Sequence, residues 1–135
     1  MRKISWQYRL LAAARAAGKK AYAPYSKFRV GAALLTDGGR VVTGVNVENA
    51  SYGLTLCAER AALASAVAAG FRRFKAIAVV VSGKKPAVPC GACLQALAEF
   101  CKPDLIVLAA TATRPAKVKI FKLHDLLPLA FRFRS

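Results

Sequence analysis

The feature that most constrains this chain is a pair of short cysteine segments that are chemically useful only when the fold brings them together. The first reads Cys-Ala-Glu-Arg from Cys57, and the second reads Pro-Cys-Gly-Ala-Cys, with its thiols at Cys90 and Cys93. Three protein ligands suit a tetrahedral zinc ion that keeps its fourth position for water, as catalytic zinc sites do. We therefore predict a catalytic zinc centre in which Glu59, two residues after Cys57, handles the protons of that water.

The four cysteines also leave a closed structural site and a disulfide framework open. A closed site needs Cys101 as the fourth ligand, because the single histidine, His124, lies in a late stretch that we expect to be exposed. Cys101 follows Cys93 by eight residues, which is roughly 12 Å along a helix at about 1.5 Å per residue. That distance is too long to complete the same tetrahedron, and nothing in the chain indicates secretion, so we favour the open site.

These residues resemble a known signature. Cys-x-Glu followed by Pro-Cys-x-x-Cys is typical of zinc-dependent deaminases, many of which carry histidine at the first position. Residues 46–60, Asn-Val-Glu-Asn-Ala-Ser-Tyr-Gly-Leu-Thr-Leu-Cys-Ala-Glu-Arg, look like the small tetrameric cytidine deaminases, and the similarity runs from about Pro24 to Phe131. The resemblance implies a zinc-dependent enzyme of pyrimidine salvage that converts cytidine and deoxycytidine to uridine and deoxyuridine, with Glu59 as its proton shuttle.

The resemblance also implies a role for Arg60. Three thiolates around a zinc ion leave a net negative charge, which weakens the metal as a Lewis acid. In cytidine deaminases with three cysteine ligands, the arginine at this position bonds to the thiolates and offsets part of their charge. Position alone is equally consistent with a helix arginine that faces solvent, and the resemblance favours contact with the thiolates.

Several substrate contacts are implied by the resemblance, position by position. Phe28 matches the residue that packs beside the pyrimidine, and Ala58 matches a position that contacts the substrate. Asn46 and Glu48 match the pair that bonds the ribose 3′-hydroxyl, and their spacing puts both side chains on one face of a strand end. Without the resemblance, Phe28 reads as a core residue, and Asn46 and Glu48 read as surface residues.

Two further matches concern assembly. Tyr52 and Phe131 match positions that reach into a neighbouring subunit's site in the tetrameric family, so the resemblance implies a homotetramer. Taken alone, Phe131 is simply a C-terminal packing residue. The chain departs from the family at Leu94, where an arginine is usual, at Val88, where a small polar residue is usual, and after Phe131, where Gly-Pro is common. These departures leave substrate contacts and subunit packing open, but not the reaction class.

Hydrophobic periodicity and turn residues predict the order of the elements. We expect helices at 6–17, 57–69 and 90–100, strands at 27–35, 40–47, 76–81, 105–110 and 117–122, and a helical turn at 123–127. This order predicts an α/β fold with a five-stranded mixed sheet and helices on both faces, in agreement with the three-layer α/β/α deaminase fold that the resemblance implies. Only about six residues separate the last two strands, so they should pair antiparallel. Both cysteine segments would start helices, where the partial positive charge favours thiolates.

Length and N-terminal composition set further expectations. The 135 residues suit a single domain, residues 1–135, and no apolar run is long enough for a membrane helix. Gln7, Tyr8 and Arg9 interrupt any signal-peptide core, and free thiols as metal ligands suit a reducing compartment, so we expect a cytoplasmic protein.

The net charge of +16 is unusual, with 22 basic residues against six acids. Because the charges are dispersed, we expect at most weak, salt-sensitive binding to nucleic acid.

Three interpretations remain: a nucleoside deaminase, a deaminase acting on cytosine in nucleic acid or on another aminopyrimidine nucleoside, and an inactive zinc-stabilised binding module. Glu48 favours a nucleoside with a free 3′-hydroxyl, and Glu59 argues against the inactive module.

Overall fold

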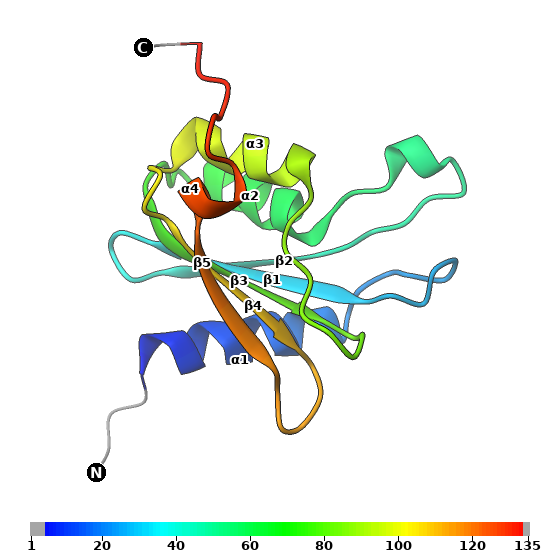
Figure 1. The fold of residues 1–135 in the computed structure, drawn as a ribbon. Coiled ribbons are helices and arrows are strands. Elements are labelled where there is room, and N and C mark those ends of the chain that lie inside the picture. Colours follow the sequence, from blue (N-terminus) through cyan, green and yellow to red (C-terminus); the bar gives the residue numbers. More distant parts are fainter. Residues whose placement is uncertain (1–4, 134–135) are drawn as a thin grey trace.

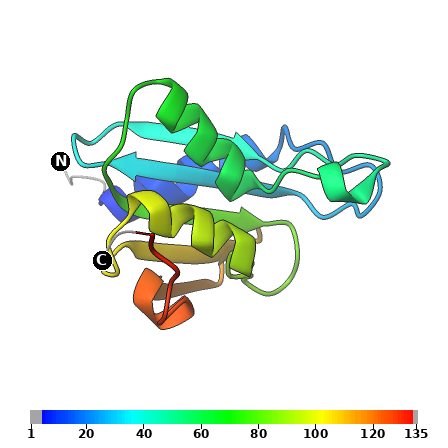
Figure 2. The same ribbon diagram turned by 90° about the horizontal axis from the view of Figure 1, so that it is seen from above.

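The computed structural model describes residues 5–133, which form a five-stranded sheet with the order β2-β1-β3-β4-β5 (Figure 1). In chain order the elements are α1 (Trp6–Gly18), β1 (Val30–Thr36), β2 (Val41–Val45), η1 (Tyr52–Leu54), α2 (Ala58–Ala68), β3 (Phe74–Val81), α3 (Gly91–Phe100), β4 (Ile106–Thr111), β5 (Val118–Lys122) and α4 (Leu123–Leu126). Helix α1 covers one face of the sheet, and α2 and α3 cover the other (Figures 1 and 2). The prediction of a mixed sheet with helices on both faces is confirmed. No helix within the described residues is long and apolar enough to cross a membrane.

The strand directions follow from the connections between strands. β3 and β4 are parallel and are joined through α3, as a crossover between parallel strands requires. β4 and β5 pair antiparallel, which agrees with their short connection, and β1 pairs antiparallel with both β2 and β3. β3 lies between helices on both sides and is therefore almost continuously apolar.

Side chains of the central strands alternate between two hydrophobic clusters. Ala32 and Leu34 of β1 belong to the cluster on the side of α2 and α3, whereas Ala33 belongs to the cluster on the side of α1. A shift of one residue in the strand register would exchange these faces, so burial on both sides fixes the register. The sheet is thereby a rigid support for the helices that carry the cysteine segments.

Helix α2 lies directly against β2 because Gly44 has no side chain. A Cβ atom at Gly44 would overlap backbone atoms of Ala58 and Ala62 in α2. Cys57 is the N-cap residue of this helix, and Glu59 lies in its first turn. The close approach at Gly44 therefore sets the position of both residues relative to the sheet.

Helix α3 also begins directly after a cysteine, since Cys90 is its N-cap residue. Neither the Cys57 nor the Cys90 side chain caps its own helix by a hydrogen bond. Both sulfur atoms are therefore available to another partner at helix ends that favour negative charge.

Some element boundaries differ from the sequence prediction. The strand expected at 27–35 begins only at Val30, because Lys27 has a positive φ of 61° and turns the chain. The strand expected at 40–47 ends at Val45, and Val47 continues it only through single bridges to Tyr22 and Leu56. The short helix η1 was not predicted.

Candidate metal centre and active site

Three cysteine sulfurs meet at the N-termini of α2 and α3. The Sγ atoms of Cys57, Cys90 and Cys93 lie within 4.8 Å of one another, and those of Cys90 and Cys93 are 3.6 Å apart. Thiolates bound tetrahedrally to zinc at about 2.3 Å have their sulfurs about 3.8 Å apart, so the group needs little movement to accept this ion. Cys101 is buried in the hydrophobic core and does not belong to the group.

The surroundings of the thiols suit a cation. The backbone at the start of α3, above all the N–H group of Cys93, lowers the pKa of the Cys90 thiol. Burial has the opposite effect on Cys93 and raises the pKa of its thiol. A buried thiolate requires nearby positive charge, which a divalent metal supplies. The donor set therefore fits Zn²⁺.

Arg60 lies against this cluster, as the resemblance implies. Its Nη2 atom is 3.6 Å from Cys57 Sγ, and hydrogen bonds to the thiols of Cys57 and Cys93 raise the pKa of the guanidinium. The Nε atom of Arg60 is buried, and within residues 5–133 it has no hydrogen-bond partner. The guanidinium thus faces the sulfurs rather than bulk solvent.

Glu59 is a buried carboxyl group in the first turn of α2. Burial raises the pKa of Glu59 above its ordinary value, although its own backbone N–H and the charge of Arg60 oppose the rise. A buried carboxyl close to a metal centre is a common arrangement for a group that transfers protons.

A pocket of about 220 Å³ brings several of the predicted residues together. The predicted residues that line it are Phe28, Asn46, Cys57, Ala58, Glu59 and Cys90, and the remaining lining residues are Val30, Thr55, Leu56, Val79, Val81, Ala87 and Val88. Apart from Val88, sequence reasoning did not single out the second set. Those residues look like ordinary strand and loop residues until the sheet places β3 beside the start of α2.

Asn46 has a structural role that the sequence did not indicate. Its Nδ2 donates to the carbonyl oxygen of Phe28 at 2.8 Å, and its Oδ1 accepts from the backbone N–H of Val30 at 2.9 Å. Asn46 therefore holds the segment that carries Phe28 against the end of β2. On the other side of Phe28, a Cβ atom at Gly83 would lie only 3.1 Å from the ring.

Glu48 and Tyr52 lie in a second hollow of about 370 Å³, which shares Thr55 with the pocket. The Glu48 carboxylate accepts hydrogen bonds from the backbone N–H groups of Tyr25 and Ser26, at 3.0 and 3.2 Å, and from the Ser26 hydroxyl. The bond from the Ser26 hydroxyl is the main cause that lowers the pKa of Glu48. The two predicted ribose contacts, Asn46 and Glu48, therefore lie in adjoining hollows.

Phe131 does not line the pocket of its own chain. Phe131 is 71% exposed, and Tyr52 is 79% exposed. The two departures from the family pattern lie in different surroundings, since Leu94 is buried in the core and Val88 is an exposed residue of the pocket wall.

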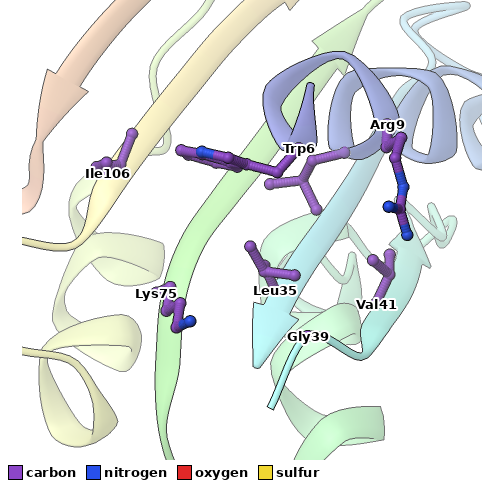
Figure 3. A pocket seen from close by; sticks show the side chains of 8 residues that line it. Trp6, Arg9, Leu35, Gly39, Val41, Lys75 and Ile106 are labelled. Carbon is purple, nitrogen blue, oxygen red and sulfur yellow. The ribbon is translucent and has the colours of Figure 1, made fainter. Parts of the chain in front are cut away.

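A further hollow of about 370 Å³ lies between α1 and the sheet, away from α2 and α3 (Figure 3). Trp6 and Arg9 project from α1 over Leu35, Val41 and Ile106. This hollow is larger than the pocket at the cysteines, but its lining contains no thiol and no carboxylate. The candidate chemistry therefore lies on the opposite face of the sheet.

The fold and the cysteine cluster together define an α/β protein with a three-cysteine group suited to zinc and a buried carboxyl group beside it. The chain belongs to the family described as the cytidine and deoxycytidylate deaminase zinc-binding region, whose model matches residues 4–109.

The relatives match most of the chain. Cytidine deaminase of Halalkalibacterium halodurans is 50% identical over 111 residues, which cover 82% of this chain and 83% of that protein. Cytidine deaminase of Mycobacterium tuberculosis is 44% identical over 131 residues, covering 97% of this chain and 92% of that protein. The crystal structure of cytidine deaminase from Burkholderia pseudomallei is 54% identical, with a TM-score of 0.86, and covers 92% of this chain and 98% of that one.

Proposed function

We propose that this protein hydrolyses cytidine and deoxycytidine to uridine and deoxyuridine, releasing ammonia, with Zn²⁺ as its cofactor. The observation that carries the proposal is the buried Glu59 carboxyl in the same pocket wall as Cys57 and Cys90. Membership of the deaminase family, with relatives named cytidine deaminase, selects this reaction among the hydrolyses that an open zinc centre supports.

Glu59 carries the proton transfers of the proposed mechanism. A zinc ion held by Cys57, Cys90 and Cys93 would lower the pKa of water and so supply a hydroxide nucleophile near neutral pH. Glu59 accepts one proton of that water and gives it to N3 of the cytosine ring, as the hydroxide adds to C4. It then accepts the proton of the new C4 hydroxyl group and passes it to the amine, which leaves C4 as ammonia. This role is supported by the burial of Glu59 in the pocket wall, two residues after Cys57 and outside the group of three cysteines.

Arg60 moderates the charge of the metal centre in this proposal. Its guanidinium contacts the Cys57 sulfur and offsets part of the negative charge of the thiolates. It thereby preserves the ability of the metal to acidify water.

The substrate spans the two adjoining hollows. The pyrimidine occupies the 220 Å³ pocket, beside Phe28 and near Ala58, and the sugar extends past Thr55 toward Glu48. Glu48 then accepts a hydrogen bond from the 3′-hydroxyl, which takes the place of the Ser26 hydroxyl, while Asn46 contacts the sugar from the pocket side. A free 3′-hydroxyl is thus recognised by a carboxylate that is already ionised.

We also propose a homotetramer in which Tyr52 and Phe131 complete the site of a neighbouring subunit. The supporting observation is that Tyr52, Phe131 and Leu129 are large side chains that remain exposed in a single chain. Like charges oppose assembly at +16 per chain, but screening over about 8 Å at physiological salt limits this repulsion.

A reducing cytoplasm, where thiols stay free to bind metal, is the corresponding location, and pyrimidine salvage is the corresponding role.

Nucleic acid is the second candidate substrate, and the net charge of +16 is the observation that favours it. A polynucleotide would use phosphate contacts that weaken steeply with salt, and its internal cytosines lack the free 3′-hydroxyl for Glu48.

A comparison of substrates tests the proposed function. The absorbance change on deamination is followed with cytidine, deoxycytidine, CMP and a short cytosine-containing oligonucleotide. We expect fast turnover of the two nucleosides and only salt-sensitive binding of the oligonucleotide. Faster deamination of the oligonucleotide than of cytidine would replace the proposal with the second candidate.

A further inference from the structure

The C-terminal segment passes beside α3 (Figure 2). Gln95, a residue of this helix, holds the segment there. Gln95 Nε2 donates to the carbonyl oxygen of Phe131 at 2.7 Å, and Gln95 Oε1 accepts from the backbone N–H of Phe131 at 3.2 Å. One side-chain amide therefore binds both backbone polar groups of a single residue. A contact through two bonds fixes the orientation of the backbone as well as its distance from the helix.

Arg132 provides a second anchor at the end of the same helix. Its guanidinium donates to the carbonyl oxygens of Ala98, at 2.5 Å, and Cys101, at 3.3 Å. The last carbonyls of a helix lack partners within the helix, so these bonds cap α3 and hold the residue after Phe131. Two consecutive residues of the C-terminal segment are therefore tied to α3.

These anchors leave the ring of Phe131 free. The backbone N–H and carbonyl of Phe131 both face Gln95, so its Cβ atom is directed elsewhere, and the side chain is largely exposed. A residue that must enter another subunit's site loses less conformational entropy when its backbone is already fixed. The bonds to Gln95 supply this fixation.

We propose that Gln95 is a positioning residue, which orients the C-terminal segment so that Phe131 enters the neighbouring subunit's site and tightens nucleoside binding there. This inference rests on the proposed cross-subunit role of Phe131. Helix α3 then serves two sites. Its start carries Cys90 and Cys93 of its own metal centre, and Gln95 directs the ring of Phe131 toward the site of the neighbouring subunit.

Steady-state kinetics with two variants test the inference. Gln95→Ala removes both bonds, and Gln95→Glu keeps the size of the side chain but removes the donor to the Phe131 carbonyl. We expect each variant to raise KM for cytidine roughly tenfold, as the loss of one or two hydrogen bonds implies, while kcat and zinc content stay near the original values. Glu99→Gln, an exposed change one turn further along α3, is the control and should leave KM unchanged.

Hydrogen exchange gives a readout of the same contact that does not depend on activity. Backbone amides of residues 129–133 should exchange faster in Gln95→Ala than in the original protein, whereas amides within α3 should not. Unchanged exchange of the C-terminal segment would contradict the anchoring role.

A double variant separates positioning from general damage to the helix. In a Phe131→Ala background, Gln95→Ala should raise KM no further, because the ring that it positions is already gone. Additive effects would overturn the inference. A raised KM for Phe131→Ala, together with unchanged KM for both Gln95 variants, would overturn the inference and leave the proposed role of Phe131 standing. An unchanged KM for Phe131→Ala would instead remove that cross-subunit role itself.

Discussion

The metal side and the sugar side of the candidate site are built differently. On the metal side, Cys57, Cys93 and Glu59 lie in the first turns of two helices that rest on the sheet. On the sugar side, Glu48 and Tyr52 lie outside the named strands and α-helices, and the Tyr52 side chain is exposed. The chemical groups are therefore assembled within one chain, whereas our proposal assigns the cover over the substrate to a neighbouring chain.

This contrast indicates which changes should matter most. A site preorganised by helix starts loses its function when one ligand is removed, because no neighbouring group can replace it. A surface that is completed by substrate or by another subunit should respond more gradually. The experiments below test this order of effects.

Removal of a metal ligand should have the largest effect. We expect Cys90→Ala to lose bound zinc. Its activity should fall by more than about 100-fold, because the loss of a residue that only hydrogen-bonds to a metal ligand already costs up to about that factor. Cys101→Ala is the matched control, because Cys101 is a buried cysteine outside the cluster. Metal analysis of the purified variants checks both statements, and zinc retained by Cys90→Ala or lost by a folded Cys101→Ala would contradict the ligand assignment.

Loss of the proton shuttle should come next. Glu59→Gln keeps the shape of the side chain but no longer accepts a proton, so we expect kcat to fall roughly 10²- to 10⁴-fold. Zinc content and cytidine affinity should stay close to the original values, because the carboxylate is not a ligand. Titration calorimetry with cytidine and metal analysis supply these controls, and near-normal kcat in the variant would remove Glu59 from its role.

Replacement of Phe131, the proposed cover from a neighbouring subunit, should reduce activity only in part. Mixing this variant with an inactive variant should then restore activity. Glu59→Gln and Phe131→Ala chains are dissociated, combined in equal amounts and reassembled. If Phe131 acts in a neighbour's site, about a quarter of the sites in random tetramers combine an intact Glu59 with an intact Phe131, and activity rises above both parents. Native mass spectrometry confirms the mixed tetramers. Mixed tetramers without recovered activity would mean that Phe131 serves its own chain, and a monomer in light scattering would exclude the assembly.

The metal side could be predicted from the sequence because its signals are local. The spacing of Cys90 and Cys93 and the helix starts at both cysteine segments are visible within a few residues, and only one long-range contact was needed to join them. The mixed sheet was equally accessible, since the order of elements along the chain and the short connection between the last two strands predicted it. The order of the strands within the sheet was not predicted. The roles of Glu59 and Arg60 in turnover remain predictions.

The sugar side was less accessible because it depends on long-range geometry. The bonds from Asn46 to Phe28 and Val30 require the pairing of β1 with β2 and the late start of β1 after Lys27. Thr55 carries no periodic signal, and its place between the two hollows depends on the whole loop before α2. The expectation of a single domain over residues 1–135 also stays a prediction.

The smallest expected effect concerns the Ser26–Glu48 contact on the sugar side. The Ser26 hydroxyl is the main cause of the lowered pKa of Glu48, so Ser26→Ala should raise that pKa toward its ordinary value. A carboxyl whose pKa is lower in the folded chain stabilises the fold above its ordinary pKa, and this stabilisation is lost as pH falls through the folded value. The stability difference between the original protein and Ser26→Ala should therefore be largest near neutral pH and should shrink in acid.

Carbon NMR of the Glu48 carboxyl group measures this shift directly and also tests the proposed sugar contact. In the proposed complex the 3′-hydroxyl of cytidine replaces the Ser26 hydroxyl, so we expect saturating cytidine to bring the Glu48 pKa of the original protein and of Ser26→Ala close together. A nucleoside without the 3′-hydroxyl should bind the same pocket and leave the two pKa values apart. If cytidine and the 3′-deoxy nucleoside gave the same titration curves, Glu48 would not contact the sugar, and its hollow would be a surface feature of the loop rather than part of the site.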